Sequence, residues 1–122
     1  GLPEGENKVL AGGPMMGRSV ETLDVPVCKG TNAITVLTGQ KARRKAVQPC
    51  IRCAKCAFAC PMGLEPWLTA VKDWERLERE QVTSCISCGS CQYSCPAHRP
   101  ILDNIVVGKA AVMGIIKNRN KK

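Results

Sequence analysis

The chain has 122 residues, among them nine cysteines but only four aromatic residues, and a formal net charge of +8 at pH 7. A chain of this length fits one small domain or part of a larger protein, and its apolar core is modest. No apolar run is long enough for a signal peptide or a membrane span, and the start GLPEGENK is typical of mid-chain sequence. We therefore expect a soluble fragment or processed piece, supported by metal ligation rather than by aromatic packing.

The first 45 residues combine a glycine-proline loop with short β-branched runs. GGPMMG occupies 12–17, TLDVPV occupies 22–27 and AITVL occupies 33–37. This order predicts a loop followed by two short strands, as at the end of a β-rich domain. The glycines lack the spacing and the following helix of a nucleotide-binding fingerprint, so we interpret them as a loop. Cys28 stands apart from the other cysteines and is predicted to be a thiol without a ligand role.

The other eight cysteines form two copies of the pattern C-x2-C-x2-C-x3-C-P. The copies are CIRCAKCAFACP at 50–61 and CISCGSCQYSCP at 85–96, offset by 35 residues (85 minus 50). Neighbouring residues match at the same offset, namely Ile51 with Ile86, Phe58 with Tyr93 and Pro61 with Pro96. The chain therefore contains an internal duplication. We expect these six residues to pack around whatever the cysteines bind.

The spacing within each copy predicts an iron-sulfur site. Three cysteines at every third residue can place three thiolates on three irons of one [4Fe-4S] cluster, and the fourth cysteine of this pattern ligates the other cluster. The predicted ligands of cluster one are Cys50, Cys53, Cys56 and Cys95, and those of cluster two are Cys85, Cys88, Cys91 and Cys60. Each proline fixes φ and lacks an amide hydrogen, so we expect it to lead from the loop into the first turn of a helix.

Two other uses of the cysteines fit the pattern less well. Zinc takes four thiolates from paired C-x2-C knuckles, which leaves the third evenly spaced cysteine and the proline unexplained. Disulfides are disfavoured because nothing marks secretion and adjacent C-x2-C pairs would strain each other as bridges.

Helices are predicted on both sides of the second motif. Leu64, Trp67, Leu68, Val71, Trp74 and Leu77 share one face of a helix over 64–80. Both tryptophans are therefore expected in the core rather than as electron relays. A second apolar stripe predicts a helix over 101–116, before the basic tail KNRNKK. The expected organisation is an N-terminal segment over 1–45, a mainly α dicluster domain over 46–109, and a helix end with a basic tail over 110–122.

Positive charge collects beside the first motif and in the tail. Residues 41–55 contain six Lys or Arg and no acid. Such a surface suits an acidic redox partner or anionic lipid. Specific nucleic-acid binding is disfavoured because the basic run lacks interleaved exposed aromatics and a known fold motif. His98, the only histidine, is expected to be structural or exposed, since both predicted clusters already have four cysteines.

Four stretches of the sequence resemble one family when taken together. GGPMMG, VPVCKGTNAI, PCIRCAKCAFACPMGLEP and CISCGSCQYSCPAHRPI occur in the same order in the C-terminal part of the RnfC family, the C subunit of the Rnf electron transport complex. The resemblance covers residues 12 to about 109. It implies a helical two-cluster ferredoxin-like fold after the end of an SLBB or β-grasp-like domain. Cys28 departs from the family pattern.

The resemblance also implies a function and a setting. The RnfC family belongs to an ion-translocating ferredoxin:NAD oxidoreductase on the cytoplasmic face of the membrane, with FMN and NADH bound by upstream domains that this chain lacks. Its partners are the other Rnf subunits and redox proteins. We expect an electron relay that is not catalytic alone. The iron-sulfur part of another soluble reductase, such as a cobalamin reductase, and a zinc-stabilised basic interaction module stay open as alternatives.

Overall fold

The computed structural model describes residues 2–70 and 73–121. It divides the chain into two compact units, Gly1–Ala46 and Val47–Lys122. The predicted border after residue 45 lies one residue from this division. That the first unit ends a larger β-rich domain stays a prediction.

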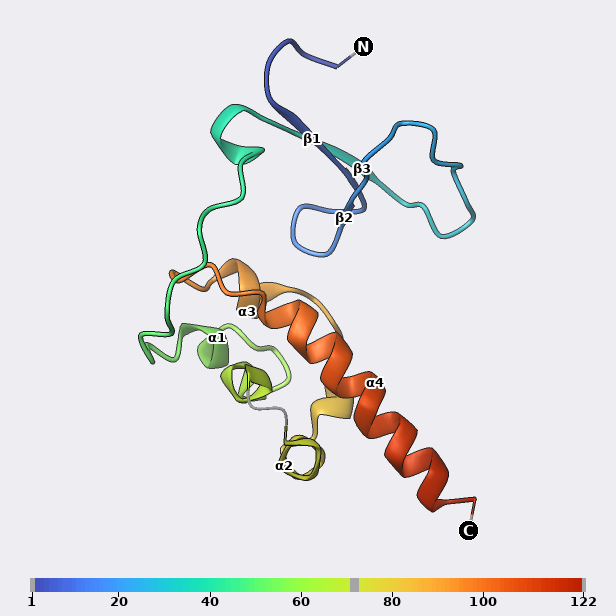
Figure 1. The fold of residues 1–122 in the computed structure, drawn as a ribbon, viewed down its shortest axis with the longest axis vertical. Helices are drawn as coiled ribbons and strands as arrows, with labels where there is room; N and C mark the ends of the chain where they lie inside the picture. The colour runs from blue at the N-terminus through green and yellow to red at the C-terminus, as the bar shows by residue number, and fades with distance from the viewer. Residues whose placement is uncertain (1, 71–72, 122) are drawn as a thin grey trace. The chain divides into compact units, whose positions relative to one another are not determined.

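The first unit is a small antiparallel sheet. Its strands are β1 (Asn7–Ala11), β2 (Arg18–Ser19) and β3 (Ile34–Thr38), in the order β2-β1-β3, and the 3-10 turn η1 (Gly39–Lys41) follows β3. Figure 1 shows β1 and β3 running side by side, with Leu10 opposite Thr35 and Val9 opposite Val36. Leu10 is buried, whereas Ile34 is 60% exposed. Side chains that alternate across the pleat give this sheet one covered and one open face.

The two predicted strands of this unit fare differently. AITVL forms β3 as expected, but the expected strand over 22–27 is wrong, because residues 20–33 contain no strand and Leu23, Val25 and Val27 are exposed. Pro26 has no amide hydrogen to give to a ladder, which explains why a β-branched run fails to pair here. The sheet instead uses β1, whose sequence NKVLA carries only a weak strand pattern.

GGPMMG forms the tight connection between β1 and β2. The Gly17 amide donates a hydrogen bond to the Gly13 carbonyl oxygen at 2.7 Å. A Cβ at position 17 would lie only 2.5 Å from that oxygen, so only glycine fits. The loop is therefore a structural turn, which agrees with its interpretation from the sequence.

Among its described residues, the regular elements of the second unit are all helices or 3-10 turns, and they are joined by irregular segments. It contains α1 (Lys55–Phe58), the 3-10 turn η2 (Pro66–Ala70), α2 (Trp74–Arg79), the 3-10 turn η3 (Val82–Ser84), α3 (Ser90–Tyr93) and α4 (Ile101–Arg119). In Figure 1 the long helix α4 runs past the shorter helices, and α2, α3, η2 and η3 contact it. The core that they share comprises Cys56, Leu68, Leu77, Val82, Cys91, Ile101, Ile105 and Val112. Two thiols thus lie inside the apolar core.

Helix α4 confirms the helix predicted over 101–116 and extends it to Arg119. Its buried side places Gly108 against α2, where an added Cβ would lie 3.0 Å from Leu77 Cδ1. At its end, the Arg119 guanidinium donates two hydrogen bonds of 3.1 Å to the Glu78 carboxylate of α2. No helix within residues 2–70 and 73–121 is both long enough and apolar enough to cross a membrane.

The single amphipathic helix predicted over 64–80 is wrong. The described parts of this stretch form η2 and α2 as separate elements, and Val71 lies outside the described residues. Asp73 is extended at φ −99° and its side chain accepts a hydrogen bond from the Arg76 amide, so it caps a new helix that begins at Trp74. Trp74 packs against the core, but Trp67 is 44% exposed and does not belong to it.

Candidate iron-sulfur site

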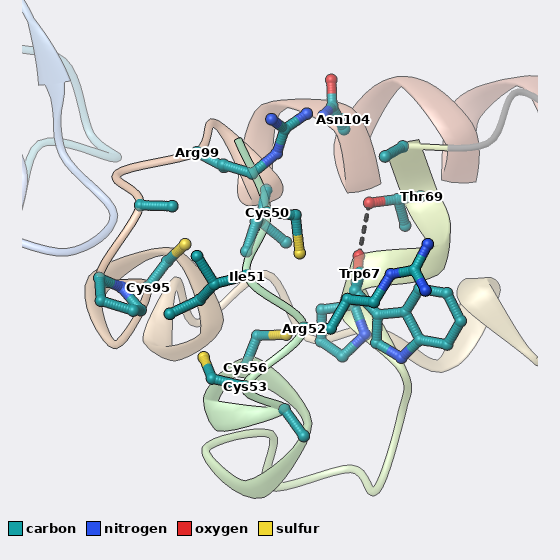
Figure 2. A pocket seen from close by; sticks show the side chains of 16 residues that line it. Cys50, Ile51, Arg52, Cys53, Cys56, Trp67, Thr69, Cys95, Arg99 and Asn104 are labelled. Atoms are coloured by element: carbon teal, nitrogen blue, oxygen red, sulfur yellow. Dashed lines mark hydrogen bonds between the residues drawn. The ribbon is translucent and has the colours of Figure 1, made fainter. Parts of the chain in front are cut away.

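Four cysteines from both motifs line the larger cavity of the second unit. Cys50, Cys53 and Cys56 come from the segment that leads into α1, and Cys95 follows α3. The cavity has a volume of about 540 Å³. Figure 2 shows the four side chains around it, with Ile51 between the two segments and Trp67 at another wall. The structure therefore brings together the four residues predicted as ligands of cluster one.

The other four cysteines line a second cavity. Cys60 follows α1, whereas Cys85, Cys88 and Cys91 come from the segment that leads into α3. This cavity has a volume of only about 20 Å³, so a cluster bound here requires the side chains around it to move apart. The set matches the predicted ligands of cluster two. Both sets thus cross between the motifs.

The backbone repeats the duplication seen in the sequence. Helices α1 and α3 lie at the same offset as the cysteines. Positive φ angles recur in matched pairs, at Arg52 and Ser87 (55° and 56°), Ala54 and Gly89 (58° and 78°) and Gly63 and His98 (65° and 52°). Left-handed residues turn the chain sharply between successive cysteines, so each copy presents its thiols in the same way. Only the glycines signalled these turns in the sequence.

The proline after each motif begins a turn and not a helix, which corrects the expected helix start. The Gly63 amide donates to the Cys60 carbonyl oxygen at 3.2 Å, and the His98 amide donates to the Cys95 carbonyl oxygen at 3.2 Å. Proline is favoured at the second position of such turns because its φ is preset. The one-turn helices α1 and α3 precede the prolines instead.

The six predicted packing residues do not behave alike. Ile51 and Pro96 line the first cavity, and Ile86 and Pro61 line the second. Phe58 and Tyr93 line neither, and they are 88% and 76% exposed. Their predicted packing role is wrong, because each sits on the outer side of a one-turn helix whose inner side carries the buried cysteine.

Burial and local hydrogen bonds set the acidity of three thiols. Burial is the main cause that raises the pKa of Cys56, and it raises the pKa of Cys91 to about 11. The Ser90 hydroxyl, whose oxygen lies 3.4 Å from the Cys88 sulfur, lowers the pKa of Cys88. A thiolate is the form that binds iron, so metal binding must displace protons from the two buried thiols.

Ser87, Ser90 and Lys109 lie near the thiols and had no part in the sequence prediction, whereas Arg52 belongs to the basic run over 41–55. The Ser87 amide donates to the Cys85 sulfur at 3.3 Å, and Lys109 Nζ donates to the Cys85 carbonyl oxygen at 2.7 Å. Arg52 and Arg99 line the first cavity. Amide donors and cations near the sulfurs stabilise the more negative, reduced state of an iron-sulfur cluster. Ser90 lies 35 residues after Lys55, at the matching position of the duplication. This match is the only feature of the sequence that could have drawn attention to Ser90 as a site residue.

The donor chemistry of both sets fits [4Fe-4S] clusters. All nine cysteines are free thiols, and eight of them fall into two sets of four around two cavities. Four cysteine thiolates are the usual ligands of a [4Fe-4S] cluster. Within the described residues, no group of three or more His, Cys, Asp or Glu side chains is arranged to hold a single metal ion, so the fit to clusters rests on the kind and number of the donors. Cys28 is exposed, and its amide donates to Thr31 Oγ1 within a turn of the first unit.

Comparisons with known proteins support the presence of iron-sulfur clusters. Residues 49–100 match the 4Fe-4S dicluster domain family. The chain is 45% identical over 67 residues to the C subunit of the ion-translocating oxidoreductase complex of Rhodobacter capsulatus, which covers 55% of this chain and 13% of that protein.

Two further relatives match nearly the whole chain. The chain is 41% identical over 117 residues to the C subunit of the Na(+)-translocating ferredoxin:NAD(+) oxidoreductase complex of Acetobacterium woodii, and the match covers 93% of this chain and 26% of that protein. The chain is also 40% identical over 119 residues to the C subunit of the ion-translocating oxidoreductase complex of Haemophilus influenzae, and the match covers 93% of this chain and 18% of that protein. The chain thus spans about a quarter or less of the length of these relatives.

Proposed function

Because the chain is homologous over most of its length to part of the C subunit of ion-translocating oxidoreductase complexes and contains a 4Fe-4S dicluster domain, we propose that it relays single electrons through two [4Fe-4S] clusters. One observation carries the proposal. The duplicated motif supplies two sets of four thiols, and each set joins three cysteines of one copy to the last cysteine of the other. This pairing is what the C-x2-C-x2-C-x3-C-P pattern requires of a two-cluster ferredoxin.

Cluster one is held by Cys50, Cys53, Cys56 and Cys95, and cluster two by Cys85, Cys88, Cys91 and Cys60. When bound, a [4Fe-4S] cluster accepts and releases one electron at a time. The side chains perform no bond-making chemistry. They hold the clusters, shield them from water and adjust their reduction potentials. Ile51 and Ile86 limit the access of water at the two cavities that they line. The Ser87 amide donates a hydrogen bond to the Cys85 sulfur, and the Ser90 hydroxyl, which accepts from the Cys88 thiol, can donate to the Cys88 sulfur once that thiol is deprotonated.

The two clusters lie close together because each motif contributes to both. Helices α1 and α3 contact each other, and the ligands of both sets sit at their ends. An electron entering at one set therefore has only a short path to the other. Because the second set is more buried than Cys50 and Cys53, which are exposed, we place exchange with outside partners at cluster one.

The setting proposed for the relay follows the relatives. The protein from Acetobacterium woodii is named as part of a ferredoxin:NAD(+) oxidoreductase complex. In that setting the chain passes electrons between an FMN and NADH site on other domains and the neighbouring subunits, at the cytoplasmic face of the membrane.

Anaerobic reconstitution with iron and sulfide tests the proposal. The purified chain should bind about eight irons, as two [4Fe-4S] clusters require, and its reduced form should give an EPR spectrum of two interacting clusters. The Cys28→Ser variant is the control and should bind as much iron as the unchanged chain. Four irons or fewer, or zinc in their place, would contradict the two-cluster relay.

A further inference from the structure

Two exposed aromatic residues stand at matched positions of the duplication. Phe58 ends α1 and Tyr93 ends α3, and the two helices contact each other. Their exposed fractions, 88% and 76%, are the largest among the exposed large hydrophobic residues within the described ranges. Each copy of the duplicated motif therefore has a solvent-exposed aromatic residue at the same position relative to its cysteines.

Neither ring packs in the interior of the second unit. Both lie outside the apolar core and outside the two cavities lined by the cysteines. A water-exposed ring gives up a large favourable burial energy, and aromatic residues are enriched where proteins contact one another. Single exposed apolar residues are common, but here Met62, at 46% exposure, follows directly on α1 and adds to the apolar surface.

The two motifs carry charges of one sign. Residues 47–64 and 81–102 contain Arg52, Lys55 and Arg99 and no Asp or Glu. Lys55 is exposed and precedes Phe58 by one turn of α1, whereas Arg52, also exposed, lines the first cavity. The acids of the second unit lie instead at Glu65, over 73–80 and at Asp103. An acidic surface would therefore meet complementary charge here and be repelled nowhere within the two motifs.

We propose that Phe58 and Tyr93, with Lys55 one helical turn before Phe58 on α1, form the docking surface for an acidic electron-transfer protein. The inference rests on the proposed function, because it assigns a partner surface to the same clusters. Phe58 lies between Cys56 and Cys60, one ligand of each set, and Tyr93 lies in the same way between Cys91 and Cys95. Electron tunnelling weakens steeply with distance, so a partner seated on these rings receives electrons from nearby sulfurs.

A lipid surface shares some of this chemistry but fits less well. Membrane-surface proteins bind with a long amphipathic helix that carries cations on its polar face. Phe58 and Tyr93 instead end helices of four residues each. An electron that reaches lipid also finds no acceptor, so burying both sets of ligands against a membrane would serve no relay.

Stopped-flow electron transfer tests the docking surface. The reconstituted chain is reduced anaerobically and mixed with a small acidic two-cluster ferredoxin at low and high salt. The Phe58→Ala/Tyr93→Ala double variant should lower the second-order rate constant by about tenfold, as the loss of aromatic interface anchors does. Lys55→Gln should lower it only at low salt, because salt screens the attraction. Met113→Ala, which removes an exposed apolar side chain from α4, is the matched control and should have no effect.

The outcomes separate this inference from the proposed function. Iron content is measured for every variant and should be unchanged, and midpoint potentials are measured so that a change in driving force is separated from a change in docking. Equal rate constants for the double variant and the unchanged chain would overturn the docking surface but would leave the proposed two-cluster relay intact. The docking surface would also be overturned if the unchanged chain bound phosphatidylglycerol vesicles and the double variant did not, because the rings would then contact lipid. A chain that holds no clusters at all would instead overturn the proposed function.

Discussion

Cys56 and Cys95 line one cavity although they belong to different copies of the cysteine motif. Cys95 lies close enough to Cys56 for its charge to add to the effect of burial in raising the pKa of Cys56. Cys60 stands in the same relation to Cys85, Cys88 and Cys91 at the second cavity. Because neither copy completes a four-thiol set by itself, damage to one motif is expected to appear in the cluster of the other.

Replacing Cys60 with serine tests this crossing directly. We expect Cys60→Ser to damage the cluster held by Cys85, Cys88 and Cys91, because the variant removes the fourth thiolate of that set. The EPR spectrum that remains should match the spectrum of Cys88→Ser and differ from that of Cys53→Ser. If Cys60→Ser resembled Cys53→Ser instead, the fourth cysteine would serve its own motif and the assignment would be wrong.

Ser90 is predicted to tune the second set. Its hydroxyl lowers the pKa of Cys88, so Ser90→Ala should raise that pKa and slow the alkylation of Cys88 in the metal-free chain at neutral pH. In the loaded protein the same variant should lower the midpoint potential of cluster two, because a donor to the sulfur is lost. Peptide-resolved mass spectrometry and a redox titration give the two readouts.

Ser84→Ala, an exposed serine outside the cavities, is the control for this effect. Unchanged alkylation and unchanged potential in Ser90→Ala would show that the hydroxyl does not act on Cys88.

Gly63 is predicted to be required by the backbone of the first motif. Its φ of 65° lies in the left-handed region, so Gly63→Ala should lower the free energy of unfolding by about 1 kcal/mol. Gly114 lies in α4 with open space around it, and Gly114→Ala should raise the same quantity by roughly 0.5–1 kcal/mol. Urea unfolding under anaerobic conditions compares the two. A shift of the same sign for both alanines would count against a backbone cause.

The metal-free chain should lose stability as the pH rises from about 9 to about 11. Burial raises the pKa of Cys91 from its ordinary value near 9.0 to about 11, so the folded state holds this proton more tightly than the unfolded state does. Stability from the neutral thiol is therefore complete below pH 9 and is lost as the pH rises through the folded-state pKa. Thermal unfolding midpoints recorded from pH 9 to pH 11 measure this loss of stability. Cys91→Ala should flatten the dependence, and an equally steep loss in that variant would exclude Cys91 as its source.

The sequence by itself determined the chemistry of this protein. The spacing of eight cysteines sets how far each loop can reach, so the grouping of the thiols around two cavities was predictable without long-range information, and their assignment as ligands of two clusters stays a prediction. The apolar stripe over 101–116 likewise predicted α4, because a sustained helical period is a local property. The family resemblance was also confirmed, since relatives match 93% of the chain.

Only the tertiary structure decided which side chains face water. Phe58 and Tyr93 were expected beside the clusters because they are aromatic and repeated, but each lies on the outer side of its helix. The stripe over 64–80 likewise predicted one helix, yet Asp73 caps a new one at Trp74, since local hydrogen bonding overrode the apolar period. Burial depends on which distant segments pack against a residue, and spacing along the chain carries no record of that packing.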